Sequence, residues 1–167
     1  MRFSLLPKCV MDTPMALTPA LLQKWGIDLL MLDFDNTIIP YTTDVPTPQV
    51  EAWLQELQAS SVIVCVVSNS HNDRVKRFCA QRGMDCITHA RKPFCKGIRQ
   101  CLDKYGVKPE TAALVGDQIF TDVLGANCAG VKSVLVKPIN NHNVWLKLRH
   151  GLEKPFIYFA RNRRIKP

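Results

Sequence analysis

The strongest indication of the fold of this chain is the run Leu29-Leu30-Met31-Leu32-Asp33-Phe34-Asp35-Asn36-Thr37. Its four apolar residues predict a buried strand, and two carboxylates follow that strand directly. Because a strand directs successive side chains to opposite faces, the chain must bend just after Asp33 if both carboxylates are to reach one site. Asn36 and Pro40 supply the turn chemistry for such a bend. Alone, the motif is a weak signal, because short acidic motifs at strand ends also arise as loop or cap residues.

Three further segments complete the pattern in the same order along the chain. A second β-branched run, Val62–Val67, ends at Ser68-Asn69. Arg91-Lys92-Pro93 comes next, and the apolar run Ala113–Val115 then leads into Gly116-Asp117-Gln118-Ile119-Phe120-Thr121-Asp122. Apolar runs this short and continuous are typical of strands that are covered on both faces, as in a parallel sheet. The polar residues that follow the strands are predicted to gather at the carboxyl edge of that sheet.

Together these segments resemble the four motifs of the haloacid dehalogenase (HAD) superfamily of phosphatases: D-x-D-x-T, a strand-terminal Ser or Thr, a Lys, and G-D-x-x-x-x-D. The resemblance is closer to the subfamily IIIA proteins of YqeG type, on the stretches LDFDNTI, VVSNS, ARKP and GDQIFTDVLGAN. It extends from about Leu5 to Val136, and Phe34 stands where an aliphatic residue is more usual. It implies a phosphoric monoester hydrolase, and the family includes eukaryotic relatives that dephosphorylate phosphatidylglycerophosphate.

The resemblance also implies an α/β fold: a HAD-like Rossmannoid three-layer sandwich whose five-stranded, mainly parallel sheet is flanked by helices. The residue pattern agrees with this expectation. Apolar residues at helical spacing predict helices over residues 50–57, 75–79 and 98–105, and residues 133–136 form the last clear strand. Strands that alternate with helices imply an open parallel sheet with right-handed crossovers.

The gaps between the motifs leave no room for a cap domain, an insertion that related enzymes often carry. Thirty residues separate Thr37 from Ser68, and one helix with a short flap around residues 41–46 accounts for them. Twenty-three residues separate Ser68 from Lys92, which is enough for a helix and a short strand. We therefore expect an open site and a large substrate that brings its own bulk to exclude water.

By the resemblance, Asp33 is the nucleophile that attacks phosphorus and forms an aspartyl-phosphate. Asp35 is the general acid that protonates the leaving alcohol, and then the base that activates water. Mg²⁺ is the expected cofactor, held by the carboxylates of Asp33 and Asp117 and by the backbone carbonyl of Asp35. This small ligand set suits Mg²⁺, which prefers octahedral oxygen coordination and keeps several waters. Asp122 is expected to orient a metal-bound water or Lys92 without binding the metal itself.

The resemblance assigns the binding of the phosphoryl group to Ser68, Asn69 and Lys92, together with backbone N–H groups near Phe34. Thr37 is expected to brace the loop rather than touch the substrate. Each of these residue types also has a structural interpretation, because carboxylates and hydroxyls cap turns and helices and most lysines are solvated. The occurrence of all four motifs in family order at strand ends favours the catalytic interpretation.

The 167 residues are predicted to form one domain over residues 1–167, large enough to bury most of its apolar surface. The first fifteen residues lack the sustained apolar core of a secretory signal. No stretch approaches the roughly 20 apolar residues of a membrane span. Seven cysteines without a C-x-x-C pair indicate reduced thiols and disfavour a zinc site. A cytoplasmic protein is the resulting expectation.

The net charge of +8 resides in the C-terminal part of the chain. From residue 132 onward there are nine Lys or Arg and one acid, whereas the charges of the preceding residues cancel. Residues from about 141 to 167 form a basic amphipathic segment in which aromatic residues such as Trp145 and Phe156 are interleaved with cations. Such a segment can dock on an anionic membrane or pack on the domain, with Pro155 interrupting any long helix. Nucleic acid is a less favoured partner.

The leading hypothesis is therefore Mg²⁺-dependent hydrolysis of a bulky phosphomonoester such as phosphatidylglycerophosphate, with peripheral contact to the inner membrane face. A phosphatase for a soluble metabolite or nucleotide, with a cap obtained from another protomer, is one alternative. The other is a catalytically idle HAD-fold module that binds RNA or ribosomes through the basic segment. The sequence leaves the oligomeric state open.

Overall fold

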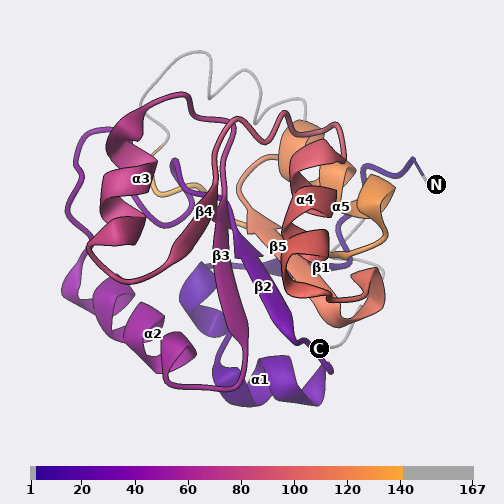
Figure 1. Cartoon of the computed structure of the whole chain (residues 1–167), viewed down its shortest axis with the longest axis horizontal. Coiled ribbons are helices and arrows are strands. Elements are labelled where there is room, and N and C mark those ends of the chain that lie inside the picture. Colours follow the sequence, from indigo (N-terminus) through magenta and orange to yellow (C-terminus); the bar gives the residue numbers. More distant parts are fainter. Residues whose placement is uncertain (1–2, 141–167) are drawn as a thin grey trace.

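The computed structural model describes residues 3–140, and a six-stranded sheet lies at its centre (Figure 1). The strands are β1 (Cys9–Met11), β2 (Leu29–Leu32), β3 (Ile63–Val67), β4 (Asp85–Ile87), β5 (Ala112–Gly116) and β6 (Lys132–Val136). They lie in the order β1-β6-β5-β2-β3-β4. Every neighbouring pair is parallel, so all six carboxyl ends point to one edge of the sheet.

Helices connect the strands, and local sequence signals begin and end them. The described α-helices are α1 (Pro19–Lys24), α2 (Pro48–Gln58), α3 (Asp73–Ala80), α4 (Lys96–Tyr105) and α5 (Leu124–Ala129), with the shorter turns η1 (Pro14–Ala16), η2 (Pro109–Thr111) and η3 (Ile119–Val123). The hydroxyls of Thr18 and Thr47 cap α1 and α2, and Asn72 caps α3. Gly106 ends α4 at a φ of 63°, in the left-handed region that glycine adopts without strain. The helices predicted over residues 50–57, 75–79 and 98–105 correspond to α2, α3 and α4.

Alternate residues of the central strand face opposite helical layers. Leu30 and Leu32 of β2 belong to the core that α1, α2 and α3 complete. Leu29 and Met31 belong to the second core, which α4 and α5 complete. Figure 1 accordingly shows α2 and α3 on one side of the sheet and α4 and α5 on the other. The predicted three-layer sandwich with a mainly parallel sheet is confirmed.

The sheet has six strands where the sequence predicted five. The additional strand, β1, pairs with β6 at the edge of the sheet, with Cys9 opposite Val134 and Met11 opposite Val136. A segment of three residues carries no measurable periodicity, so nothing in the local sequence distinguishes this strand from a loop. The predicted boundaries of β3, β5 and β6 agree with the observed ones to within one residue at each end.

The direction in which the chain crosses the sheet reverses at β2. From β2 the chain proceeds to β3 and β4 on one side, and then returns to β5 and β6 on the other. Open parallel sheets bind their ligands beyond the carboxyl ends of the strands at such a switch point. Asp33, Ser68 and Asp117 directly follow β2, β3 and β5, so the topology brings all three to this place.

No domain is inserted between the motifs within residues 3–140. The segment that joins β2 to α2 is a loop containing a short flap, residues 40–47, and β3 is joined to β4 through α3. The prediction of a fold without a cap domain therefore holds for this part of the chain. No helix in the same part is both long and apolar enough to cross a membrane. The basic segment predicted over residues 141–167 lies outside the described residues.

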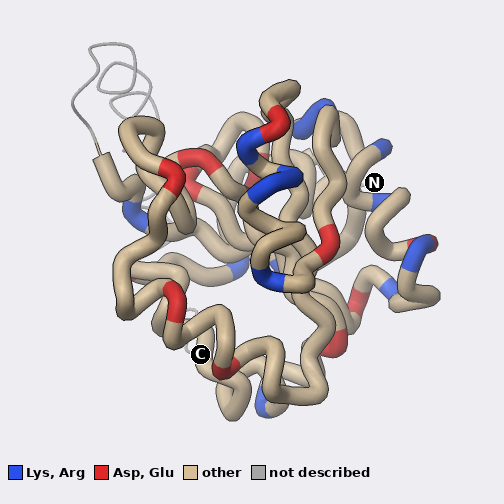
Figure 2. Tube along the Cα trace, turned by 60° about the vertical axis from the view of Figure 1, so that its left-hand side comes forward, with Lys and Arg blue, Asp and Glu red and all other residues tan. Residues whose placement is uncertain are grey.

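Charged residues of both signs are interspersed along the described part of the chain (Figure 2). This distribution agrees with the cancelling charges that the sequence shows before residue 132. Since net charge governs association rather than fold, the excess of cations bears on partners and not on this core.

The packing of α2 on the sheet provides a test of the fold. Leu54 is almost completely buried against the sheet, whereas the neighbouring Gln55 is exposed. Replacement of Leu54 by Ala should lower the free energy of unfolding by about 2–5 kcal/mol, because it removes buried methyl groups and leaves a cavity. Gln55→Ala is the matched control and should change that free energy by no more than about 0.5 kcal/mol. Urea denaturation measures both, and equal effects would contradict the assigned orientation of α2.

Candidate active site

The loop after β2 holds the first carboxylate in a fixed position. The Asp33 N–H donates to the carbonyl of Val115 at 2.8 Å, which continues the pairing of β2 with β5. The Thr37 hydroxyl donates to Asp33 Oδ2 at 3.0 Å, so Thr37 braces the loop. The carbonyl of Phe34 accepts hydrogen bonds from the N–H groups of Ile38 and Ile39, which closes the loop into a compact turn. Asp33 therefore cannot swing away from the strand end.

Asn36 is a buried residue of this loop that the sequence interpretation treated only as a turn former. Its φ of 65° lies in the left-handed region, which asparagine tolerates better than most residues. Its side-chain amide donates to Asp117 Oδ2 at 3.3 Å and to the carbonyl of Asn140 at 3.1 Å. Asn36 thus ties the loop to the end of β5 and to the segment after β6. The sequence signal was its place within the D-x-D-x-T motif, but its partners are far away in the chain.

Lys92 is the central cation of the site. Its side chain is almost completely buried, and Nζ lies 2.7 Å from Asp33 Oδ1 and 2.7 Å from Asp122 Oδ1. Burial by itself lowers the pKa of the Lys92 ammonium, but the carboxylates of Asp122 and Asp33 outweigh burial and hold that pKa above its ordinary value. The lysine is therefore a permanent positive charge between two carboxylates. Asp122 was predicted to orient Lys92, a role that depends on direct contact between the two side chains, and the structure has that contact.

The backbone of Lys92 is clamped by the loop after β3. Asn69 Oδ1 accepts from the Lys92 N–H at 2.7 Å, and Asn69 Nδ2 donates to the Lys92 carbonyl at 2.8 Å. The Ser68 carbonyl accepts from the N–H of Ala90 at 3.0 Å. Both polar atoms of the Asn69 side chain are thus bonded to the Lys92 backbone, while its predicted contact with the phosphoryl group stays a prediction. The buried Ser68 hydroxyl accepts from the N–H of Ser70 at 3.0 Å and lines the cavity described below.

Asp117 and Asp122 come from the end of β5 and from η3, a single π-helical turn. Such turns are rare and are often found at functional sites. The Gln118 N–H donates to Asp122 Oδ2 at 3.1 Å and fixes that carboxylate against the strand end. A Cβ atom at Gly116 would overlap the Asp122 carboxylate, so only glycine leaves room for it. This close approach is the physical reason for a glycine directly before Asp117.

Asp35 faces a cation that sequence reasoning did not identify. Arg74 Nη1 lies 2.8 Å from Asp35 Oδ1. Burial raises the pKa of the Asp35 carboxyl above its ordinary value, and the Asp33 charge adds to this, while Arg74 and Lys92 oppose it. A carboxyl with a raised pKa is suited to donate a proton.

Some of these side chains line one small cavity of about 120 Å³ at the carboxyl edge, whereas Thr37, Asp117 and Asp122 are not among its lining residues. The predicted residues that line it are Asp33, Asp35, Ser68, Asn69 and Lys92. Four further lining residues were not predicted, namely Tyr41 of the flap together with Ser70, Gln118 and Thr121. Gln118 and Thr121 lie within the fourth motif, Ser70 follows Asn69 and Tyr41 belongs to the flap, but no property of these residue types marks them out.

Three buried carboxylates of the site fit a divalent cation. Asp33, Asp117 and Asp122 are buried, and one oxygen of each lies within 4.8 Å of the others. Three carboxyl groups lie beside the single ammonium of Lys92, which leaves a deficit of positive charge even though burial raises the pKa of the Asp122 carboxyl to about 7. Oxygen ligands and such a charge deficit match what Mg²⁺ requires. The donor set is therefore suitable for that ion.

Comparison with known proteins agrees with this geometry. A family model described as HAD-hydrolase-like matches residues 89–147. The protein named "Probable phosphatase YqeG" of Bacillus subtilis is 33% identical over 123 residues, which cover 74% of this chain and 72% of the relative. The chain belongs to the HAD-like hydrolases. The predicted membership of a HAD-type phosphatase family is confirmed.

Two solved structures share the fold of this HAD-like hydrolase. The 3-deoxy-D-manno-octulosonate 8-phosphate phosphatase of Yersinia pestis aligns with a TM-score of 0.55 and 18% identity, and covers 77% of this chain and 73% of that chain. The phosphatase of the same name from Moraxella catarrhalis, in complex with magnesium, phosphate and KDO, aligns with a TM-score of 0.50 and 18% identity. That alignment covers 86% of this chain and 97% of the other. At such identities the likeness concerns the fold alone.

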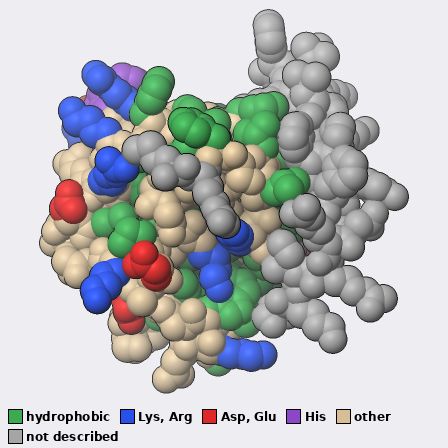
Figure 3. Space-filling view, turned by 90° about the vertical axis from the view of Figure 1, so that its right-hand side faces the viewer, with side chains coloured by type: hydrophobic (Ala, Val, Ile, Leu, Met, Phe, Trp, Pro, Cys, Tyr) green, Lys and Arg blue, Asp and Glu red, His purple; other side chains and the backbone are tan. Residues whose placement is uncertain are grey.

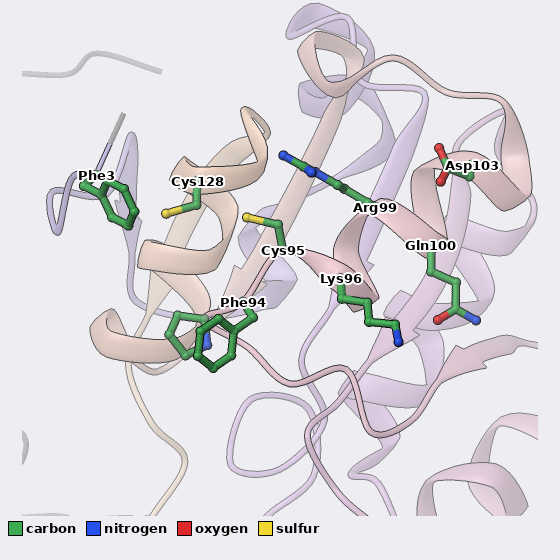
Figure 4. A pocket seen from close by; sticks show the side chains of 9 residues that line it. Phe3, Phe94, Cys95, Lys96, Arg99, Gln100, Asp103 and Cys128 are labelled. Atoms are coloured by element: carbon green, nitrogen blue, oxygen red, sulfur yellow. The ribbon is translucent and has the colours of Figure 1, made fainter. Parts of the chain in front are cut away.

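A second and larger hollow of the HAD-like hydrolase begins one residue after Lys92. It is a groove of about 700 Å³ whose lining includes Phe3, Phe94, Lys96 and Arg99 (Figure 4). Phe3 and Phe94 are among the most exposed large apolar residues of the described chain. The corresponding face of the molecule carries hydrophobic side chains beside Lys and Arg (Figure 3). The groove thus combines apolar surface with the cations Lys96 and Arg99, and Asp103 also lines it.

The close approach at Gly116 gives a test of the site. Gly116→Ala should push the Asp122 carboxylate away from β5 and displace Lys92 with it. A shift of about 1 Å in a catalytic group can reduce turnover about 100-fold, and we expect a loss of that order in phosphate release. Leu54→Ala is the control, because it weakens the fold without touching the site and should keep its activity below its unfolding temperature. Full activity in folded Gly116→Ala protein would contradict the role given to Asp122.

Proposed function

We propose that this HAD-like hydrolase is a Mg²⁺-dependent phosphomonoesterase that acts through an aspartyl-phosphate on Asp33. The observation that carries the proposal is the buried ammonium of Lys92, held at 2.7 Å from both Asp33 and Asp122 beside the carboxylate of Asp117. A phosphomonoester repels anionic nucleophiles, so its hydrolysis depends on fixed positive charge and on alignment. This arrangement supplies both.

Asp33 is suited to nucleophilic attack because both of its oxygens are oriented. Lys92 binds Oδ1 and Thr37 binds Oδ2, so the carboxylate presents a defined face to the cavity. An oxygen of Asp33 forms a bond to phosphorus while the bond from phosphorus to the leaving oxygen breaks. Lys92, Ser68 and backbone N–H groups near Phe34 would bind the oxygens of the group in transfer. Their donors are already in place, so little reorganisation is needed.

Asp35 completes the reaction as acid and then as base. Burial raises the pKa of the Asp35 carboxyl, which favours its use as the donor of a proton to the leaving alcohol in the first step. The resulting carboxylate then accepts a proton from the water that attacks the aspartyl-phosphate, which releases inorganic phosphate and restores Asp33. Protons therefore balance over the two steps, and Asp35 ends the cycle as it began.

Asp33 and Asp117, with the backbone carbonyl of Asp35, are the residues that would hold Mg²⁺. When bound, the ion supplies positive charge against the oxygens of the phosphoryl group. The charge deficit of the buried cluster supports this assignment, as does the magnesium reported with the structural neighbour from Moraxella catarrhalis. Asp122 has one oxygen on Lys92 and the other on the Gln118 N–H, so its role is to hold the lysine.

We propose a bulky substrate, with phosphatidylglycerophosphate as the leading candidate. The catalytic cavity is small, at about 120 Å³, so most of a substrate must lie outside it. The groove lined by Pro93 and Phe94 also has Phe3 as apolar lining and the cations Lys96 and Arg99, a combination suited to an anionic lipid. The basic composition of residues 141–167 is consistent with peripheral attachment to an anionic membrane.

A phosphatase for a small soluble metabolite is the second candidate. The observation that favours it is the small volume of the catalytic cavity, which suits a compact ester as well as the end of a large one. A catalytically idle binding module is disfavoured. Burying a lysine among carboxylates costs stability, and a protein that did not use the cluster would have no reason to bear that cost.

The nucleophile is tested by a pair of identical substitutions at the two ends of β2. Asp33→Asn should lower phosphate release by about 10⁴-fold or more, because only binding and alignment remain. Asp28→Asn changes an exposed carboxylate at the opposite end of the strand and should leave activity unaltered. Dialysis of the wild-type protein against EDTA should abolish activity, and Mg²⁺ should restore it. Turnover retained by Asp33→Asn would remove Asp33 from its assigned role.

The substrate class is tested by comparing a lipid with its own headgroup. Phosphatidylglycerophosphate in mixed micelles should be hydrolysed with a kcat/KM at least about tenfold above that of the deacylated compound, a factor that corresponds to about 1.4 kcal/mol. Sugar phosphates, nucleotides and phosphopeptides complete the panel. A preference for the deacylated compound or a sugar phosphate would exclude the lipid and leave the phosphatase assignment intact.

A further inference from the structure

Arg74 lies outside the motifs, and its guanidinium contacts both Asp35 and the flap. Its side chain is only 12% exposed, and Nη1 pairs with Asp35 Oδ1 at 2.8 Å. Nη2 donates to the carbonyl of Pro40 at 2.7 Å and also to the carbonyl of Thr43, while Nε pairs with Asp44. One guanidinium therefore bridges the proposed general acid and the flap, residues 40–47.

The stability of α3 does not explain an arginine at this position. Arg74 is in the first turn of α3, where the helix dipole disfavours positive charge. Its guanidinium lies 5.0 Å from the ring centroid of Phe34, which is fully buried and in edge contact with Phe78. The aromatic face and the acidic partners thus hold a cation at a place that the helix itself does not favour. Phe34 consequently shapes the surroundings of Asp35, because it helps to hold Arg74 beside that carboxyl.

We propose that Arg74 is a positioning residue that holds the Asp35 carboxyl toward the leaving oxygen of the substrate. This inference rests on the proposed function, since it assigns a role within the same reaction. In the first step Asp35 gives its proton to the leaving oxygen as the bond to phosphorus breaks, and only a carboxyl in the correct orientation can do so. The planar fork of arginine fixes that orientation through Nη1 while Nη2 and Nε fix the flap.

The role predicts a dependence on the leaving group that a structural residue would not produce. p-Nitrophenyl phosphate releases a stable anion that needs little protonation, whereas benzyl phosphate of similar size releases an alkoxide that needs a general acid. General acid catalysis is typically worth about 10²–10⁴-fold. A loss of orientation at Asp35 must therefore appear chiefly with the benzyl ester. The measured quantity is kcat/KM, which reports the step that forms the phosphoenzyme.

The test uses Arg74→Met and Arg74→Lys with both esters in the full-length protein. Arg74→Met should lower kcat/KM for benzyl phosphate by about 10- to 100-fold and for p-nitrophenyl phosphate by less than about threefold. Asp35→Asn should show the same selectivity, only more strongly. Arg74→Lys keeps the charge but not the fork, and should recover part of the loss. Should Arg74→Met fail to fold in a thermal unfolding scan, the Lys variant decides through the same ratio of losses.

Asp44→Asn is the matched control, because it removes one partner of Arg74 on the flap and leaves the contact with Asp35. It should change both esters equally and by less than about threefold, as expected for an exposed ion pair. Equal losses with both esters in the Arg74 variants, or a selective loss in Asp44→Asn, would overturn the inference alone. A folded wild-type protein that hydrolyses neither ester nor any phosphate of the substrate panel would overturn the proposed function, and this inference with it.

Discussion

The ion pairs of Lys92 are the interaction on which the rest of the site depends. A single ammonium joins Asp33 at the end of β2 to Asp122 in η3, and all three groups are buried. Burying these charges is costly, and removal of any one of them would leave another uncompensated in a region of low polarity. The three charged groups consequently depend on one another. The cluster is stable when complete, and each member fixes the orientation of the others. That mutual constraint is what a preorganised phosphoryl site requires.

The fold supplies this constraint through its topology. Parallel strands deliver Asp33, Ser68 and Asp117 to one edge, and the reversal of chain direction at β2 leaves room between their loops. Two secondary devices then adjust the geometry. Asn69 clamps the backbone of Lys92, and the missing side chain at Gly116 admits Asp122. The geometry of the site in this HAD-like hydrolase thus rests on a short set of contacts.

The sequence predicted the residues that motifs and strand ends mark, and it missed those that only tertiary contacts define. Asp33, Ser68 and Asp117 could be placed together because apolar runs identify strands, and parallel strands end at one edge, whereas Lys92 was expected from the resemblance of its motif. Arg74 could not be predicted, because its partner Asp35 is 39 residues away and an arginine in a helix is expected to be solvated. β1 was missed because three residues show no periodicity. Both misses concern partners chosen by the fold rather than by the local chain.

The bonds of Asn36 have a consequence for how this protein acquires activity. Asn36 joins residues 81 and 104 positions away, and Lys92 reaches Asp33 across 59 positions. Closing the loops between residues so distant in the chain costs entropy before the contact repays it. A chain that has formed only its helices and other local contacts has no assembled cluster. Catalysis is therefore a property that appears only once β5 has docked beside β2, and recovered turnover during refolding reports the completed sheet.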